Sequence, residues 1–476
     1  MRYREGSIQR IKHFIGIDRA VFFTLASRVL QVVSSTGTVL LIIRYLSPVA
    51  QGYYYTLLSL VALQTIFELG FSFVILQLAA HETAHLTLHS DGHIDGDPVA
   101  HARLASVLQL TVRWYSRAAI ALAAILLPLG IEFFARRDHA AAQVSWQGPW
   151  VTAVLAVSIS FLMTPLYSFF EGCNQVRQVA AMRMYQSLVV LAMSWGAIAS
   201  GHGLYACALV NLGVVLVGLL FIRNRRHILL HLLRYPAAGH AVSWRREVWP
   251  FQWQIAVSWL CSYFTVQVFT PILFAFRGPQ QAGKMGLSLS ITAYLPILAL
   301  SWMTTKAAPF GRFIQQKRIS ELNALFKRTL IQSFTLILIL TGACFAAVLG
   351  VQHIFPKIAA RMEPPSTFVL LLLTAISTFV VQSLAVYLRS FKREPYLVLS
   401  TVVAFLTVVS VLLVAPKWGN TAVAICYFIF SGAMGLVWAV AIFRGWKRSQ
   451  PELTEAMATS VAGLPGTDVP PQLVRK

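Results

Sequence analysis

Two long apolar runs open the hydrophobic part of the chain, AVFFTLASRVLQVVSSTGTVLLIIRYL at 20–46 and YYYTLLSLVALQTIFELGFSFVILQLA at 53–79, with SPVAQG at 47–52 between them. Each run is longer than the about 20 residues that a helix needs to cross the hydrocarbon core of a bilayer. The six residues between them predict a tight turn, because proline and glycine end one helix and permit the next to begin. The stretch therefore predicts a transmembrane helical hairpin.

The composition extends this prediction to the whole chain. Of 476 residues, 57% are hydrophobic and only 12% are charged, and the mean hydropathy is +0.66, which excludes an ordinary soluble domain. Ten more apolar runs follow, at 111–134, 149–171, 184–200, 204–222, 248–276, 284–306, 328–351, 366–388, 396–415 and 420–443. We therefore expect an all-α polytopic membrane protein with about twelve transmembrane helices.

The distribution of charge favours a membrane topology over nucleic-acid binding. The net charge is +22, and with both termini in the cytoplasm most of the 39 Lys and Arg residues fall on cytoplasmic loops or helix ends. This is the bias that the positive-inside rule describes. The basic segment 1–19 lacks the pattern of a removable signal peptide, so we expect the first helix to remain in the mature protein.

The cysteines predict neither a disulfide framework nor a zinc site, because they are scattered beside apolar runs without CxxC spacing. They are Cys173, Cys207, Cys261, Cys344 and Cys426. We interpret them as packing residues, and the sequence predicts no cofactor and no bound metal.

An internal repeat organises the chain. The turn SPVAQG at 47–52 has a counterpart, GPQQAG at 278–283, which lies 231 residues later. Because six predicted helices, an even number, lie between the two turns, both copies enter the membrane from the same side, as parallel repeats do. The predicted parts are a basic segment at 1–19, a first six-helix lobe at 20–222, a cytoplasmic linker at 223–247, a second six-helix lobe at 248–443 and a disordered cytoplasmic tail at 444–476.

Polar residues on the first two helices form the first candidate site. Arg28, Gln31 and Ser35 recur at steps of three or four residues and share one helix face. Arg28 lies about 12 Å into the membrane and Glu68 roughly 16 Å from the same side, so the two can meet. One interpretation is a structural ion pair between them. In the other, Arg28 contacts an anion in a water-filled cavity, and Glu68 either modulates this contact or binds H⁺ or Na⁺.

The repeated helices carry polar faces as well. Gln254 and Ser262 lie on one face of the helix at 248–276, and Lys284 begins a similar face on the next helix. Serine and threonine also serve helix packing in membranes, so the glutamines and Lys284 are the stronger evidence for a cavity.

Two motif matches do not predict their usual chemistry. His81, Glu82 and His85 fit the HExxH pattern of zinc proteases, but nothing fixes a third ligand near them. We expect a solvated interfacial helix that continues to His93, and keep a membrane zinc protease as an alternative. GPQQAGK at 278–284 starts like a phosphate-binding P-loop, but Met285 replaces the magnesium-binding Ser or Thr. Its glycines are better explained by a tight turn.

Short basic turns close the fourth and tenth predicted helices. They are EGCNQVR at 171–177 and RSFKREP at 389–395. Either they reflect topology alone, or they contact an anionic headgroup at the inner leaflet.

At these residues the sequence resembles the bacterial polysaccharide repeat-unit flippases of the multidrug, oligosaccharidyl-lipid and polysaccharide exporter superfamily, which serve O-antigen and exopolysaccharide synthesis. The matching pieces are RYLSP at 44–48 with GYY at 52–54, ELG at 68–70, EGCNQVR at 171–177, WPFQWQ at 249–254 and the turn at 389–395. ASRVL at 26–30 is also similar to the first-helix signature of the related lipid II flippases, in which the arginine lines the central cavity.

The resemblance implies a V-shaped pair of six-helix lobes in the bacterial inner membrane. It implies a non-enzymatic transporter that flips an undecaprenyl-diphosphate-linked oligosaccharide by alternating access, with H⁺ or Na⁺ as a candidate coupling ion and other polysaccharide assembly proteins as candidate partners. A cation-coupled small-molecule exporter of the same superfamily is the alternative. The residues expected at the cavity are Arg28, Gln31, Ser35, Glu68, Gln252, Gln254, Ser262, Lys284 and Arg389.

Overall fold

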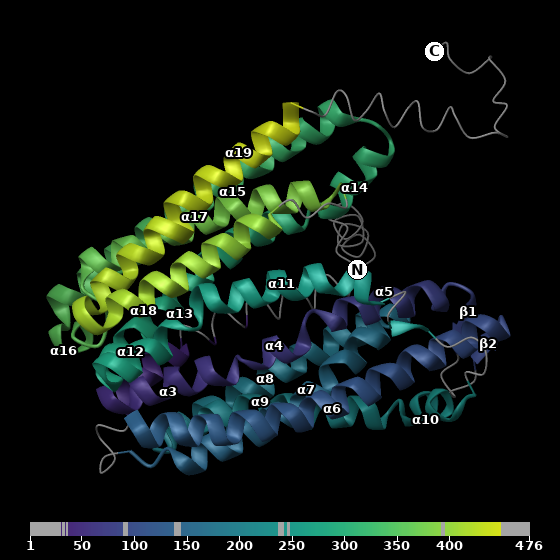
Figure 1. Ribbon diagram of the computed structural model, residues 1–476, viewed down its shortest axis with the longest axis horizontal. Coiled ribbons are helices and arrows are strands. Elements are labelled where there is room, and N and C mark those ends of the chain that lie inside the picture. The colour runs from purple at the N-terminus through teal and green to yellow at the C-terminus, as the bar shows by residue number, and fades with distance from the viewer. Residues whose placement is uncertain are drawn as a thin grey trace, which may run out of the picture.

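The computed structural model describes residues 30, 34, 37–88, 94–137, 144–236, 242–244, 248–391 and 396–448. Figure 1 shows two groups of helices that meet at one end and diverge toward the other. We call the end where they meet the junction end, and it carries the turn before Pro48 and the turn at Gly278. We call the opposite end, which carries Arg225 and Arg389, the basic end.

The described part of the first lobe is helical except for one short hairpin. The two strands of the hairpin pair antiparallel, with Thr87 opposite Asp95. The elements of this lobe are α3 (Pro48–Val61), α4 (Gln64–Glu68), α5 (Phe71–Thr83), β1 (Leu86–Leu88), β2 (Ile94–Gly96), α6 (Pro98–Arg137), α7 (Gln147–Gly172), α8 (Val176–Ala199), the 3₁₀ turn η1 (Gly203–Tyr205), α9 (Ala206–Arg223) and α10 (Arg226–Arg234).

The second lobe is helical throughout its described part. Its elements are α11 (Trp249–Val266), α12 (Phe269–Arg277), α13 (Pro279–Thr304), α14 (Ala307–Gln315), α15 (Ile319–Ile354), α16 (Pro356–Ala359), α17 (Pro365–Arg389), α18 (Leu397–Tyr427), the π-helix η3 (Phe428–Met434) and α19 (Gly435–Arg448).

The predicted fold class is confirmed. Among the described residues, eight helical segments are long and apolar enough to cross a membrane, and nine with the bent pair Pro48–Glu68 and Phe71–Thr83. Three further features match the predicted runs. α8 is 24 residues long, residues 37–45 are the helical end of the first run, and α18 is kinked at Gly419 (φ 72°), where two of the predicted runs adjoin.

The prediction of a turn over 47–52 is wrong in its extent, because helix α3 already begins at Pro48. The Ser47 hydroxyl accepts a hydrogen bond from the backbone N–H of Ala50 at 3.1 Å. Proline at the first helical position loses no hydrogen bond, since that N–H has no partner inside a helix. Ser47 and Pro48 together therefore start the helix rather than a loop.

The prediction of one continuous helix over 53–79 is also wrong. The helix is interrupted between α3 and α4, and the chain breaks again after Glu68, where the segment Pro48–Glu68 meets α5 at a bend of 42°. Leu69 and Gly70 both have positive φ angles, 49° and 67°. Glycine adopts this left-handed conformation without steric cost, whereas leucine pays about 1 kcal/mol.

The two repeated turns explain how the lobes meet. α3 packs along α13, and a Cβ on Gly52 would lie only 1.9 Å from the carbonyl oxygen of Pro279. A Cβ on Gly283 would lie 2.9 Å from the backbone nitrogen of Gly52. Both glycines are helical, so they serve close packing of the two helices rather than the tight turn that the sequence predicted. We call this contact the junction.

Candidate functional site

The first-helix residues of the candidate site, Arg28, Gln31 and Ser35, lie outside the described residues. Thr38, which shares their predicted face, is described, and its hydroxyl accepts a hydrogen bond from the Trp195 indole at 3.0 Å. Trp195 belongs to α8, so this part of the first helix packs within the first lobe.

Glu68 is the last residue of α4 and stands directly at the break in the second span. Its carboxyl interacts with Ser72 on α5 and with Tyr115 on α6, whose hydroxyls lie 3.1 Å apart. Broken helices in membrane transporters mark binding sites, because the break frees backbone groups near the membrane midplane. The sequence identified the carboxylate but not the break beside it.

The two glutamines of α11 differ in what the structure describes. Gln252 is completely buried, and among the described residues no group pairs with its amide nitrogen or oxygen. The side chain of Gln254 lies outside the described part. A buried amide without partners costs free energy, so Gln252 is a position at which a polar ligand or water would be stabilised.

Two predicted residues are brought together in a cavity of about 200 Å³ inside the second lobe. Ser262 of α11 and Arg389 at the end of α17 both line it, although 127 residues separate them. We call it the C-lobe pocket. Its other polar lining side chains are Ser258, Thr265, Thr378, Gln382, Tyr396, Ser400, Tyr427 and Ser431. At about 30 Å³ per water, the volume suits a few water molecules or one small polar group, not an oligosaccharide.

Lys284 lies at the junction end and faces a carboxylate that the sequence analysis missed. Glu363, in the loop before α17, is 2% exposed and interacts electrostatically with Lys284. The Asn420 side chain donates a hydrogen bond to the Glu363 carboxylate and another to the carbonyl of Gln281 at 2.8 Å. Burial raises the pKa of Glu363 to about 7, and both Asn420 and Lys284 oppose that rise.

A second set of hydrogen bonds ties the lobes together beside Glu363. The Gln51 amide of α3 donates to the carbonyl of Gly283 at 2.9 Å and to the carbonyl of Arg361 at 3.2 Å. Arg361 in turn donates to the carbonyl of Ile42 at 3.3 Å. Farther from the junction end, the Tyr263 hydroxyl of α11 donates a hydrogen bond to the carbonyl of Ser59 at 3.1 Å. The junction is thus held by polar groups as well as by the two glycines.

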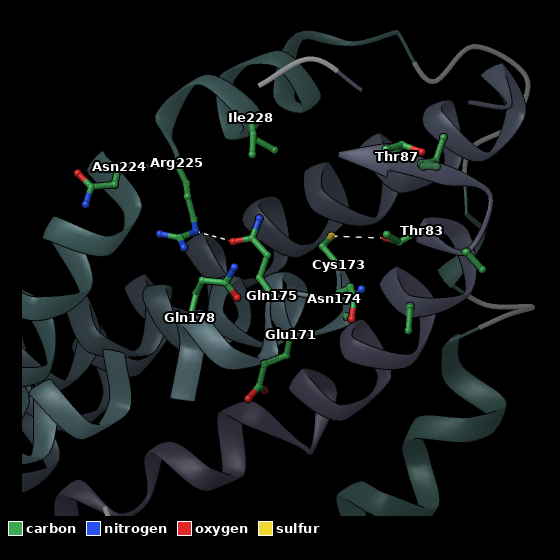
Figure 2. Close-up of a pocket in the computed structure, with 14 residues that line it drawn as sticks. Thr83, Thr87, Glu171, Cys173, Asn174, Gln175, Gln178, Asn224, Arg225 and Ile228 are labelled. Carbon is green, nitrogen blue, oxygen red and sulfur yellow. Dashed lines mark hydrogen bonds between the residues drawn. The ribbon is translucent and has the colours of Figure 1, made fainter. Parts of the chain in front are cut away.

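A larger cavity, of about 1010 Å³, opens at the basic end of the first lobe. Figure 2 shows its polar side chains, which come from α5, from β1, from the α7–α8 turn and from the α9–α10 turn. We call it the N-lobe pocket. Arg225 extends into it and donates from Nε to the Gln175 side chain at 2.6 Å. The sequence indicated this region only as one of the short basic turns.

The HExxH segment is not the continuous interfacial helix that the sequence predicted, because α5 ends at Thr83 and β1 follows. His81 is exposed, whereas Glu82 is buried and accepts from Arg103 Nε at 2.8 Å. A carboxylate neutralised by arginine is a poor general base. His89 and His93 lie outside the described residues.

The missed residues had partial signals in the sequence. Gln51 lies inside the repeated turn, but its counterpart is Ala282, so the repeat gave no reason to choose it. Glu363 precedes two prolines in a short loop, and sequence alone places such a carboxylate in water. Only the three-dimensional contact of α3, α13 and this loop buries it.

No protein-family model matches the chain, and the comparison with curated protein sequences finds no relative. Solved structures do match over nearly the whole length. The lipid II flippase MurJ in an inward closed conformation matches with a TM-score of 0.56 and 13% identity, covering 94% of this chain and 94% of MurJ.

Two transporters match at a similar level. The MATE multidrug transporter DinF-BH, in complex with R6G, has a TM-score of 0.53 and 12% identity over 90% of this chain and 95% of its own. A MOP superfamily transporter from Pyrococcus furiosus has a TM-score of 0.52 and 11% identity over 90% of this chain and 95% of its own. At these identities the likeness concerns the fold. The chain is a multi-pass membrane protein with the two-lobed helical fold of these transporters.

Proposed function

We propose that this protein is a transporter that flips a polyprenyl-diphosphate-linked oligosaccharide from the inner to the outer leaflet of the bacterial inner membrane. The observation that carries the proposal is the junction, where two repeat-related lobes touch through Gly52 and Gly283 and diverge toward the other end. Two lobes that pack closely at one end and diverge toward the other can rock about a central site, which is the motion that alternating access requires.

The orientation follows from the charge distribution. With the basic end in the cytoplasm, the positive-inside rule is satisfied, and both termini are cytoplasmic. The described state then has its diverging end toward the cytoplasm, where such a lipid-linked precursor would be loaded. Release on the far side would require the junction to separate.

A lopsided anion site supports a diphosphate head group as cargo. Arg28 is the predicted intramembrane cation of the first lobe, whereas its repeat counterpart in the second lobe is Trp259. A diphosphate must leave the headgroup layer and cross a medium of low dielectric, so a guanidinium in a wet cavity would lower the barrier. Gln31 and Ser35 would contact the sugar hydroxyls.

The second candidate is a cation-coupled exporter of small molecules. Glu68 at the broken second span favours it, because a carboxylate beside a helix break suits a cationic drug or a coupling ion. The fold does not separate the two candidates, since flippases and multidrug exporters both match it.

Reconstituted vesicles distinguish these candidates. The purified protein is placed in liposomes with a fluorescent undecaprenyl-diphosphate-linked oligosaccharide in the outer leaflet, and its crossing is measured by membrane-impermeant quenching. We expect protein-dependent flipping of this lipid and no accumulation of the cationic dye rhodamine 6G. Dye accumulation driven by an ion gradient, without flipping, would support the exporter and reject the flippase.

A further inference from the structure

The N-lobe pocket is a polar hollow at the basic end of the first lobe, and nothing so far gives it a role. Three regions that are far apart in the sequence line it: the end of α5 with β1, the α7–α8 turn at Glu171–Gln178, and the α9–α10 turn at Asn224–Arg225 with the start of α10. Its volume of about 1010 Å³ is at the upper end of the range of small-molecule sites.

Arg225 is the fixed cation of this pocket. Its guanidinium stacks on the Phe221 ring at 3.7 Å, and Nε is held by Gln175 at 2.6 Å. Nη1 reaches the Phe221 carbonyl at 3.4 Å, and among the described residues no group accepts from Nη2. A stacked guanidinium keeps its donors in one plane, so this free edge is presented ready for an oxyanion.

Side-chain amides line the same pocket as the guanidinium. Asn174, Gln178 and Asn224 line the pocket, and among the described residues none of these three side chains has a hydrogen-bond partner. Asn174 is held in the left-handed conformation at φ 61°, which sets the direction of its side chain within the turn. Amides both donate and accept, so such a group matches the hydroxyls of a sugar.

The one carboxylate that lines the pocket does not oppose an anion. Glu171 accepts from Arg183 Nη2 at 3.0 Å, which neutralises it. The neighbouring Arg177, Arg223 and Arg226 are exposed and add positive potential at the same end. The pocket therefore presents one anchored cation, several free amides and no unpaired acid among its lining residues.

We propose that the N-lobe pocket binds a phosphorylated sugar, with the phosphate on Arg225 and the sugar hydroxyls on the amides of Asn174, Gln178 and Asn224. This proposal deepens the proposed function. It rests on that function in one respect, namely that the sugar phosphate is the head group of the transported lipid. In that role the pocket is a loading site, separate from the predicted intramembrane site at Arg28.

A binding experiment tests the proposal and distinguishes the two sources of this chemistry. The full-length protein in phosphatidylcholine nanodiscs is titrated calorimetrically with glucose 1-phosphate, and with glucose as the uncharged control. In a second arm the nanodiscs contain undecaprenyl-diphosphate-N-acetylglucosamine. Binding of glucose 1-phosphate shows that the free sugar phosphate suffices, whereas binding in the lipid arm alone shows that the lipid anchor is required.

Matched variants locate the binding. Arg225→Gln removes the anchored cation and should weaken binding about tenfold, as expected for loss of a charge-assisted hydrogen bond. Arg225→Lys should recover part of it. Arg226→Gln, an equal charge change on an exposed neighbour whose one described partner is His227, should leave affinity within about twofold.

The affinities of these variants can overturn the proposal. Equal affinity of wild type, Arg225→Gln and Arg226→Gln, or equal binding of glucose and glucose 1-phosphate, overturns the proposal. If Arg225→Gln does not elute as a folded protein, Asn224→Ala and Gln178→Ala replace exposed side chains and should each weaken binding about threefold. Unchanged affinity in both of these variants also overturns it.

Binding is measured without transport, so the two proposals fail separately. Wild-type protein that binds the sugar phosphate but does not flip the lipid contradicts the proposed function and retains the pocket. Protein that flips the lipid with wild-type activity in Arg225→Gln, and binds no probe in either arm, retains the flippase and rejects the pocket.

Discussion

The second span of the first lobe and its repeat, α13 of the second lobe, are alike at the junction and different at the depth of Glu68. At the junction both begin with proline at the first helical position and both place a glycine at the helix crossing. Deeper in the membrane the first copy is broken into α3, α4 and α5, whereas α13 is one helix from Pro279 to Thr304.

The difference separates a mechanical role from a chemical one. The counterpart of Glu68 is Ala299, which is completely buried, and the counterpart of Gly70 is Ser301 within α13. The symmetric part brings the lobes together, and the asymmetric part places a carboxylate beside a helix break in the first lobe. Symmetry thus serves the junction, and departure from symmetry serves the candidate site.

The largest effect is expected from removing the charge of the first lobe. Arg28→Ala should lower lipid flipping at least about tenfold, because the diphosphate loses its cationic contact. Arg28→Lys should retain part of the activity, since in a water-filled cavity the positive charge matters more than the planar hydrogen-bonding geometry of the guanidinium. The measurement is the liposome flipping assay at equal protein abundance.

Trp259→Ala is the matched control for this prediction, because it changes the repeat counterpart of Arg28. It should keep at least about half of the wild-type activity. Equal losses in Arg28→Ala and Trp259→Ala would show that the site is not built on the first lobe.

The junction glycines should be the next most sensitive positions. Gly52→Ala places a methyl group 1.9 Å from the Pro279 carbonyl oxygen, so α3 and α13 must move apart, at a cost of about 3 kcal/mol in unfolding free energy. Gly283→Ala, with its nearest neighbour at 2.9 Å, should cost less. Thermal unfolding in detergent measures both.

Gly342→Ala is the control, because no atom lies within 4 Å of its new methyl group. Helix propensity should make this variant more stable by up to about 1 kcal/mol. Gly52→Ala with an unfolding temperature at or above that of the control would contradict a tight junction.

A pH dependence should follow from Glu363 at the junction. Burial raises its pKa to about 7, while a carboxyl in an opened, hydrated junction returns to about 4.3. Below about pH 4 the group is protonated in both states. As the pH rises from there through 7, the opened state loses its proton first, so the closed junction becomes less stable and separation of the lobes is favoured.

Glu363→Gln should remove this pH dependence and keep the junction closed, because its amide oxygen can still accept from Asn420. Spin-label distances across the junction, recorded between pH 5 and 8, test the prediction. Glu321→Gln, which changes an exposed carboxylate paired with Arg318, should behave as wild type. A pH response that survives in Glu363→Gln would assign it to another group.

The smallest effect is expected at the break itself. Gly70 has a φ of 67°, so Gly70→Ala should cost about 1 kcal/mol in unfolding free energy. Ser301→Ala, at the equivalent position of the unbroken copy, should change stability by less than half as much. Equal effects in the two variants would mean that the break is not enforced by the backbone conformation at Gly70.

The sequence predicted the helices and their two-lobed arrangement well, because long apolar runs and a repeated turn are local signals. The sequence-based prediction failed where contacts between distant segments determine the local structure. The break after Glu68 depends on Leu69 adopting a left-handed conformation that its residue type disfavours. The burial of Glu363 and the cavity around Arg225 depend on loops that meet only in the folded chain.

Part of the candidate site was predictable for the same reason. Ser262 and Arg389 were each chosen from local patterns, and the structure brings them together in the C-lobe pocket. Their pairing was not predictable, because 127 residues of chain separate them and no repeat relates them.

Alternate separation of the two lobes is tested most directly by distances at both ends of the molecule. Spin labels at Ala135 and Lys417 report the junction end, and labels at Arg177 and Lys317 report the basic end, in a protein whose five native cysteines are replaced. All four positions are exposed. Adding the undecaprenyl-diphosphate-linked oligosaccharide should lengthen the first distance and shorten the second in the same population. Lipid flipping by this labelled protein with both distances unchanged would contradict the account.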